Sequence, residues 1–237
     1  MSTYVLIHGA WHGGWCWEKV APLLQRDGHT VVAPDLPGHG QDPTPTAEVT
    51  LERYARRVCE VLAAQPEPAI LVGHSMGGII ITQAAEDCPR RIRRLVYLTA
   101  FLLRNGESRL TLTPPDTVSL VRPNMVLAAD GKSATIRPEA VREVFYADCP
   151  EEDARRAAAR LVPQALQPLG AAVRTSEANF GRIPRAYIEC LNDRAIAPHL
   201  QKVMYTRLAC APVISMNTSH SPFYAAPEEL AAHLSTL

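Results

Sequence analysis

Ser75, a serine flanked by glycines, lies where a strand is expected to turn sharply into a helix. The pentapeptide Gly-His-Ser-Met-Gly at 73–77 follows the apolar run 69–72 and precedes a second apolar run, 78–85. Such a turn strains the serine backbone and exposes its hydroxyl, while the glycines let strand and helix pass closely. Because the pattern fixes only three positions, packing of small residues at an ordinary turn is an alternative. The flanking runs favour Ser75 as a nucleophile.

A nucleophilic serine needs a general base, and the base needs a carboxylate that orients it. Ligand sites in open α/β sheets lie beyond the carboxyl ends of the strands. The loop after the predicted strand 211–216 holds His220, and the loop after 185–189 holds Asp193. An isolated aspartate there would more often be a turn residue, but the chain order Ser75, Asp193, His220 favours a catalytic role. Four other histidines near strand ends are predicted to be structural: His8, His12, His39 and His74.

The groups that would stabilise an oxyanion are expected beside a glycine-rich loop, His-Gly-Ala-Trp-His-Gly-Gly at 8–14. Sites of this kind combine the amide after the nucleophile with an amide from the loop after an early strand. We therefore predict that the N–H groups of Ala10 and Met76 form the oxyanion hole. A tight turn that leads into a helix is the alternative interpretation of this loop.

Short apolar or β-branched runs alternate along the chain with longer segments of helical periodicity. Six runs are predicted to be strands: 3–8, 30–33, 69–73, 93–99, 185–189 and 211–216. Helices are expected at 15–26, 50–64, 76–87, 198–207 and 227–237. This alternation predicts an α/β fold in which a mostly parallel six-stranded sheet is covered by helices on both faces.

The alternation breaks once, over residues 101–181. This stretch shows no convincing strand, and it has helical patterns that start near Pro138 and at Pro150. Connections of such length are commonly lids over active sites. We predict one core domain, 1–100 and 182–237, with a helical cap at 101–181. An insertion without a functional role is the alternative.

Length and composition favour a protein with one domain, whose expected partner is a small molecule. The 237 residues carry 24 basic and 24 acidic side chains, so the net charge is zero and neither nucleic acid nor a membrane surface is a predicted partner. No signal peptide or membrane-spanning run is evident, which predicts a cytoplasmic protein. The six cysteines show no paired spacing, so we expect them to be reduced and structural, with no metal bound. A homodimer is compatible with the sequence, which does not fix the oligomeric state.

The chain resembles an α/β-hydrolase. More narrowly, it is similar to the methylesterase and hydroxynitrile lyase family known from plants, which has bacterial relatives. The residues that carry the resemblance are 8–17 (HGAWHGGWCW), Gly28-His29, 35–40 (DLPGHG), the turn at 73–78 (GHSMGG), the loops of Asp193 and His220, and 145–149 in the predicted cap. The resemblance covers nearly the whole chain. It implies that the first strand here corresponds to the third strand of the full eight-stranded hydrolase sheet.

That family includes ester hydrolysis and cyanide release, and two positions separate the two chemistries. Where the lyases have a threonine this chain has Gly9, and where they have a lysine it has Ser221. The lysine charge that would stabilise departing cyanide is therefore missing. The backbone amides beside Gly9 are free to hold an oxyanion. The resemblance thus implies a serine esterase that needs no metal or organic cofactor.

The predicted partner is a small ester that is largely apolar or aromatic. Residues expected at a pocket between the serine turn and the cap are Gly9, Trp11, Leu102, Phe145 and Phe223, although each apolar side chain could equally belong to the core. Alternatives on the same triad are hydroxynitrile lyase-type cleavage, lactone hydrolysis and a cofactor-free haloperoxidase. A non-catalytic ligand receptor is a further alternative. The presence of all three triad residues disfavours it.

Overall fold

The central sheet forms from six short runs of mainly apolar residues. In the computed structural model, which describes residues 1–112 and 116–237, its strands are β1 (Thr3–Ile7), β2 (Thr30–Val32), β3 (Ala69–His74), β4 (Ile92–Leu98), β8 (Arg185–Cys190) and β9 (Val213–Met216). Their order is β2-β1-β3-β4-β8-β9, and neighbouring strands pair in parallel. Every residue of β3 is buried, as expected for a central strand covered on both faces. The predicted six-stranded α/β sheet is confirmed.

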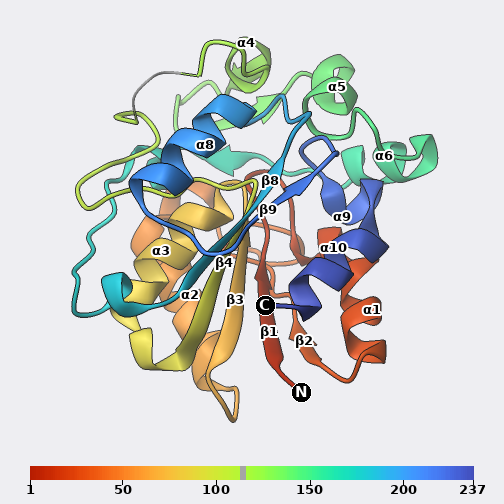
Figure 1. Cartoon of the computed structure of the whole chain (residues 1–237). Helices are drawn as coiled ribbons and strands as arrows, with labels where there is room; N and C mark the ends of the chain where they lie inside the picture. Colours follow the sequence, from red (N-terminus) through yellow and green to blue (C-terminus); the bar gives the residue numbers. More distant parts are fainter. Residues whose placement is uncertain (113–115) are drawn as a thin grey trace.

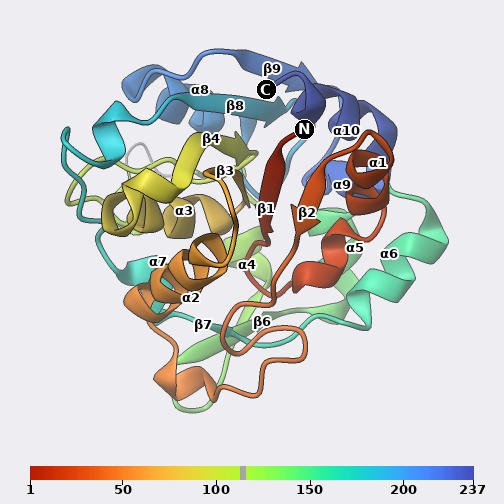
Figure 2. The ribbon, with the colours of Figure 1, turned by 90° about the horizontal axis from the view of Figure 1, so that it is seen from below.

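Helices cover both faces of this sheet (Figures 1 and 2). On one face α2 (Leu51–Ala63) packs against α3 (Gly77–Asp87), and on the other α1 (Val20–Arg26) packs against α10 (Pro227–Ser235). The remaining helices outside the 101–181 insertion are α8 (Pro198–Arg207), α9 (Pro222–Ala225) and the 3-10 helices Gly14–Trp17, Thr46–Glu48 and Pro89–Arg91. The helix predicted at 15–26 is therefore divided in two. Within the described ranges no helix is long and apolar enough to cross a bilayer.

The sequence of α2 shows how one of these helices is started and positioned. The Thr50 side chain accepts a hydrogen bond from Arg53 N (3.2 Å), which satisfies one of the free amides of the first turn. The buried residues of α2 recur at helical spacing: Leu51, Tyr54, Ala55, Val58, Val61 and Leu62. This apolar face lets α2 pack against α3, the helix that leads away from Ser75.

The insertion between β4 and β8, here called the cap segment (residues 101–181), contains a small sheet of its own. Its elements are α4 (Val121–Asn124), β5 (Met125–Leu127), β6 (Ser133–Ile136), the 3-10 helix Pro138–Ala140, α5 (Val141–Phe145), α6 (Glu151–Ala158), β7 (Gln164–Ala165), α7 (Gln167–Gly170) and the 3-10 helix Phe180–Arg182, which extends one residue beyond it. The three strands pair antiparallel in the order β5-β6-β7. The sequence shows no convincing strand here, and the structure corrects that point, because strands of two to four residues are too short to show a two-residue period. The helices α4, α5 and α6 of the cap segment lie beyond the carboxyl ends of the core strands, and the stretch after α7 runs back to the start of β8 (Figure 1).

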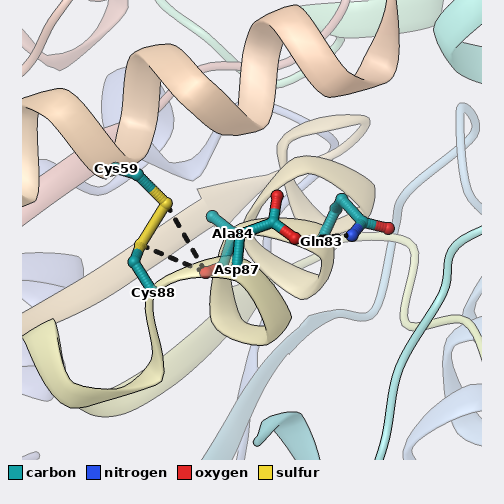
Figure 3. Close-up of a disulfide and its surroundings, with 5 residues drawn as sticks. All are labelled: Cys59, Gln83, Ala84, Asp87 and Cys88. Carbon is teal, nitrogen blue, oxygen red and sulfur yellow. Dashed lines mark hydrogen bonds between the residues drawn. A yellow bond between two sulfur atoms is a disulfide. The ribbon is translucent and has the colours of Figure 1, made fainter.

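A disulfide links α2 to the end of α3 (Figure 3). Cys59 lies on α2 and Cys88 directly follows α3, with their Cα atoms 6.0 Å apart. The prediction that all six cysteines are reduced is therefore wrong for this pair. Because 29 positions separate the two cysteines along the chain, only the packing of α2 on α3 brings them together. The other four cysteines are free, and no group of three His, Cys, Asp or Glu side chains in the described residues could hold a metal ion.

Candidate active site

Ser75 occupies a sharp turn between β3 and α3. Its φ is +56°, in the left-handed region that residues other than glycine rarely adopt, and the residue is 9 % exposed. Ser75 N donates to Leu98 O of β4 (3.3 Å), and Ser75 O accepts from Phe101 N (3.1 Å). A Cβ on Gly77 would lie 2.8 Å from the carbonyl oxygen of Ile7, so glycine is what lets α3 approach β1 this closely. These features are typical of a nucleophile elbow.

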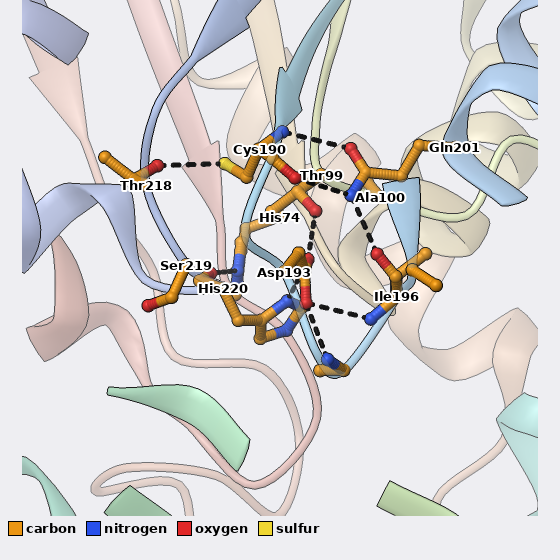
Figure 4. A network of polar contacts seen from close by, with 12 residues as sticks. His74, Thr99, Ala100, Cys190, Asp193, Ile196, Gln201, Thr218, Ser219 and His220 are labelled. Carbon is orange, nitrogen blue, oxygen red and sulfur yellow. Dashed lines mark hydrogen bonds and ion pairs between the residues drawn. The ribbon is translucent and has the colours of Figure 1, made fainter. Parts of the chain in front are cut away.

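His220 and Asp193 form a fully buried pair at the carboxyl ends of neighbouring strands (Figure 4). Their Nδ1 and Oδ2 atoms lie 2.7 Å apart. A carboxylate only accepts hydrogen bonds, so the proton of the neutral ring sits on Nδ1 and Nε2 is left free to accept one. Asp193 follows β8 and His220 follows β9, and the parallel pairing of these strands brings both loops to one edge of the sheet.

Four donors hold the Asp193 carboxylate in place. Oδ1 accepts from Ala195 N (2.6 Å) and Ile196 N (2.9 Å). Oδ2 accepts from the Thr99 hydroxyl as well as from His220. Four hydrogen bonds match the acceptor capacity of a carboxylate. The orientation of Asp193 is therefore set by the protein before any ligand arrives.

Thr99 belongs to this network, and the sequence analysis missed it. The residue directly follows β4 and has a φ of +37°, a strained conformation for a β-branched residue. Its N–H donates to Ile188 O (2.8 Å), and its hydroxyl donates to Asp193. Threonine is common in strands for packing reasons, so the residue type alone carried no signal. Its backbone strain, which only the structure shows, marks it as part of the site.

The four other histidines predicted to be structural are buried around the site. Burial lowers the pKa of His12 to about 3 and the pKa of His39 to about 4. Burial also holds the pKa of His8 and the pKa of His74 well below the ordinary histidine value. All four rings are therefore neutral near pH 7, in agreement with the structural roles expected for them.

Two of these rings tie together the segments that surround the site. His12 Nδ1 donates to Ala10 O (2.8 Å), and its Nε2 accepts from the Tyr146 hydroxyl of the cap segment (2.7 Å). His74 Nε2 donates to the carbonyl oxygen of His220 (2.8 Å). The first contact fixes the loop after β1 against the cap segment. The second fixes the backbone of the residue predicted to be the base.

The N–H groups of Ala10 and Met76 are left unused by the protein. Neither donates a hydrogen bond to any residue in 1–112 or 116–237, and both residues line the same cavity as Ser75. Met76 is also the N-cap of α3, where the helix dipole is positive. A Cβ on Gly9 would lie 2.7 Å from Ser75 Cβ, so the β1 loop approaches the serine this closely because it has glycine there. This arrangement allows the two amides to stabilise negative charge beside Ser75.

Ser75 and His220 line one cavity of about 410 Å³. Ser75 Oγ and His220 Nε2 are not hydrogen-bonded to each other in this structure, a contact that is often loose in free enzymes. Most of the wall is apolar, and most of it comes from the cap segment, with Phe101, Leu110, Leu112, Val121, Met125, Phe145, Leu166 and Leu169. The cavity can therefore hold an apolar molecule with one end at the serine.

Two of the five residues predicted to contact substrate lie on the cavity wall. Trp11 and Phe145 line it, with their ring centroids 5.6 Å apart. Gly9 lies close to Ser75 but is not among the residues that line the cavity. Leu102 and Phe223 do not line the cavity and are instead buried in the hydrophobic core. The sequence shows that these side chains are apolar, but not the direction in which each one points.

Comparison with known proteins agrees with this geometry. A model described as the alpha/beta hydrolase family matches residues 4–233. The chain belongs to the α/β-hydrolase family. The fold that the sequence predicted and the family that it resembled are both confirmed.

This α/β-hydrolase is similar to two named groups of relatives. Pyrethroid hydrolase of Sphingobium wenxiniae is 36 % identical over 98 % of this chain and 85 % of its own length. Methylesterase 2 of Arabidopsis thaliana is 32 % identical over 98 % of this chain and 94 % of its own. The crystal structure of a pyrethroid hydrolase from Sphingobium faniae JZ-2 superimposes with a TM-score of 0.88 at 33 % identity, covering 99 % of this chain and 96 % of that one.

These relatives are hydrolases and esterases by name, and the prediction of a carboxylic ester hydrolase is confirmed over the lyase and receptor alternatives. The two positions that separate esterases from lyases agree with this. A threonine at Gly9 would place its Cβ against Ser75, so it would require the β1 loop to move. Ser221 is fully buried, and its hydroxyl has no partner in the described residues. Because position 221 is a serine, no lysine directly follows His220 to stabilise a cyanide anion.

Proposed function

We propose that this protein hydrolyses small carboxylic esters through an acyl-enzyme on Ser75, with His220 as general base and Asp193 as the acid that orients it. The observation that carries the proposal is the buried Asp193–His220 hydrogen bond of 2.7 Å beside the cavity that the strained Ser75 also lines. Since Asp193 accepts four hydrogen bonds, it holds the imidazole in the tautomer that a base requires.

In the first half of the reaction, His220 Nε2 takes the proton of Ser75 Oγ as that oxygen attacks the ester carbonyl carbon. The charge that develops on the carbonyl oxygen is received by the amides of Ala10 and Met76. Asp193 stabilises the imidazolium. His220 then gives its proton to the departing alcohol, which leaves the acyl group esterified to Ser75.

In the second half, a water molecule takes the place of the serine hydroxyl. His220 removes its proton as it attacks the acyl carbon, and the same two amides hold the second oxyanion. Collapse of this intermediate breaks the bond to Ser75 Oγ, which recovers its proton from His220. The carboxylic acid then leaves, and the three residues return to their starting states.

The substrate that fits the cavity has an apolar or aromatic body. Trp11, Phe101 and Phe145 present aromatic surface near Ser75, and a cavity of about 410 Å³ suits a small molecule. One relative is named for pyrethroids and another for methyl esters, and we propose an ester of that general kind here. We further propose that residues 101–181 act as a cap on the core, because they supply most of the wall.

Location and oligomeric state stay predictions. The sequence predicts a cytoplasmic protein, whereas a disulfide such as Cys59–Cys88 is more typical of oxidising compartments. A homodimer is proposed as compatible with the chain. Thiol counting on protein from intact cells and light scattering on purified protein measure the two properties directly.

The test of function uses a panel of nitrophenyl esters of increasing acyl length, methyl esters of aromatic acids, and mandelonitrile. We expect multiple turnover on esters and none on the nitrile. Ser75→Ala is expected to lower kcat by roughly ten-thousandfold to a millionfold, as removal of a catalytic serine does elsewhere. Its melting temperature should stay close to that of the parent protein.

A fluorophosphonate probe supplies a second, direct measurement. It should add one label per chain, and peptide mapping should place that label on Ser75. Equal hydrolysis by a clean preparation of Ser75→Ala, or labelling at another residue, would refute the proposal. Turnover of mandelonitrile alone would favour the lyase chemistry instead.

A further inference from the structure

The cavity has a buried end and an open end that differ in charge. At the buried end His220 is 1 % exposed and Ser75 9 % exposed. At the other end Leu110 is 71 % exposed and Arg122 is exposed, although both line the same cavity. Arg109 lines it as well, and is partly buried. We call the part formed by Arg109 and Arg122 the arginine end.

Arg109 has no partner in the described part of the chain. It forms no ion pair with, and donates no hydrogen bond to, any residue in 1–112 or 116–237. A guanidinium carries five N–H donors in a planar fork, and it stays protonated in proteins. A partly buried group of this kind is stabilised by a ligand that can accept from the fork.

The one carboxylate among the described lining residues, Asp116, is already engaged elsewhere. Its Oδ1 accepts from Val118 N (3.3 Å) and Ser119 N (3.1 Å), and its Oδ2 accepts from Ala197 N (2.8 Å). Asp116 therefore fastens its own segment to the start of α8 and makes no ion pair with Arg109. Burial lowers the pKa of Arg109, with Asp116 acting in the opposite direction.

The charges at this end do not cancel. Arg109 and Arg122 contribute two positive charges, and Asp116 contributes one negative charge, in a chain whose net charge is zero. The remainder of one positive charge matches a singly charged anion better than a doubly charged phosphate. A carboxylate also fits the planar fork of a guanidinium with two parallel hydrogen bonds.

We propose that the arginine end binds a carboxylate, so that the preferred substrate is an ester that carries a second, ionised carboxyl group away from the bond that is cleaved. The inference rests on the proposed esterase function. The apolar wall receives the body of the molecule, Ser75 attacks its ester carbonyl, and Arg109 holds the carboxylate. Such a substrate is a half-ester of a dicarboxylic acid, or an ester whose alcohol part carries a carboxylic acid.

Two matched pairs of esters show whether the carboxylate belongs to the alcohol part or to the acyl part of the substrate. In the first pair, para-carboxyphenyl acetate is compared with para-carbamoylphenyl acetate, so the charge lies on the alcohol part. In the second pair, the nitrophenyl ester of glutaric acid is compared with the same ester of its half-amide, so the charge lies on the acyl part. Within each pair a carboxylate is replaced by a neutral group of the same shape. The measured quantity is the ratio of kcat/KM for carboxylate over amide.

The variants are Arg109→Gln, Arg109→Lys and Arg122→Gln. We expect Arg109→Gln to lower the ratio about tenfold in one of the two pairs, the loss expected for a hydrogen bond to a charged group. Arg109→Lys should keep part of the preference because it keeps the charge but not the fork. Because the ratio compares two esters on the same variant, a general change in rate cancels, and circular dichroism verifies that each variant is folded.

The matched control is Arg155→Gln on α6, an exposed arginine outside the cavity. It changes the net charge of the protein equally and should leave both ratios unchanged. The inference is overturned if Arg155→Gln lowers the ratio of kcat/KM as much as Arg109→Gln does, or if Arg109→Gln leaves the ratio unchanged in both pairs. In either case the esterase function stands. Absence of Ser75-dependent hydrolysis of the neutral esters would refute the proposed function, and this inference with it.

Discussion

The core and the cap segment contribute to the same cavity in different ways. The core supplies Ser75, Asp193 and His220, each in a loop that follows a parallel strand, whereas the cap segment supplies most of the apolar wall and both arginines. Asp193 is held by four donors, while Arg109 has no partner within the described residues. From this difference we propose that the core carries out the reaction and that the cap segment selects the ester that undergoes it.

Two polar contacts, one buried and one partly exposed, join the two parts. Tyr146 of the cap segment donates its hydroxyl to Nε2 of His12 (2.7 Å). Asp148 accepts from Ser219 N (2.6 Å) and from the Ser219 hydroxyl, directly before His220. The first contact needs a neutral imidazole, and burial keeps the pKa of His12 low enough to leave its ring neutral near pH 7. Both contacts hold the cap segment against loops of the core that surround Ser75 and His220.

The largest expected effect is a loss of stability in mild acid. Burial keeps the pKa of His8, His12, His39 and His74 low in the folded protein, whereas their pKa in the unfolded chain is near 6.5. Between the folded pKa and pH 6.5 the unfolded state binds more protons, so the free energy of unfolding falls as the pH drops. By pH 5 each histidine costs about 2 kcal/mol. Urea unfolding at pH 7, 6 and 5 measures the loss.

Between pH 7 and pH 5 the effect of the histidines on the free energy of unfolding can be measured apart from that of the acidic groups. The carboxyls whose pKa values are lowered are Glu18, Asp42 and Glu86. Their protonation lowers the free energy of unfolding only below about pH 4.5. The control is His39→Asn. In this variant one proton fewer is bound on unfolding, so the free energy of unfolding should fall less steeply as the pH drops. A free energy of unfolding that stays constant from pH 7 to pH 5 contradicts the prediction.

The second prediction concerns Asp193, which belongs to the core and does not line the cavity. Asp193→Asn should lower kcat by about ten-thousandfold, because an amide that turns its NH2 toward His220 stabilises the wrong tautomer. KM for a neutral nitrophenyl ester should change little, since Asp193 does not line the cavity. Steady-state kinetics, with circular dichroism to verify folding, provide the measurement. A decrease of less than tenfold would show that Asp193 is not the orienting acid.

Most of the core could be predicted from the sequence, because strand and helix periods are long enough there to be distinguished. The parallel sheet then brings residues distant in sequence to one edge, so the order Ser75, Asp193, His220 sufficed to propose a triad. The cap segment was harder to predict. Strands as short as β7, with two residues, leave no period, and their pairing depends on contacts that the local sequence does not encode.

Features that depend on the direction of a side chain could not be predicted from the sequence either. Leu102 and Phe223 are predicted at the substrate pocket, but both are buried in the hydrophobic core and do not line the cavity. Thr99 gave no signal because its role arises from a strained backbone. Cys59 and Cys88 pair only because two helices pack. In each case the deciding information lies in tertiary contacts.

The smallest expected effect tests the contact between the cap segment and the loop of the base. In Asp148→Asn one carboxylate oxygen is replaced by an NH2 group, so one of the two hydrogen bonds from Ser219 is lost and the other is weakened. We expect kcat to fall by roughly threefold to tenfold. This is the cost of losing one hydrogen bond to a charged group, reduced because Asp148 is exposed. KM should stay constant, because Asp148 does not line the cavity.

The matched control for this last variant is Asp130→Asn, an exposed aspartate of the cap segment whose Oδ1 accepts from Lys132 N (2.9 Å) away from the cavity. It loses the same kind of hydrogen bond and should keep the parental kcat. Ser219→Ala, which removes only the hydroxyl contact, should lie between the parent and Asp148→Asn. If Asp148→Asn raises KM and leaves kcat unchanged, the cap segment acts on substrate binding alone. The catalytic geometry then belongs entirely to the core.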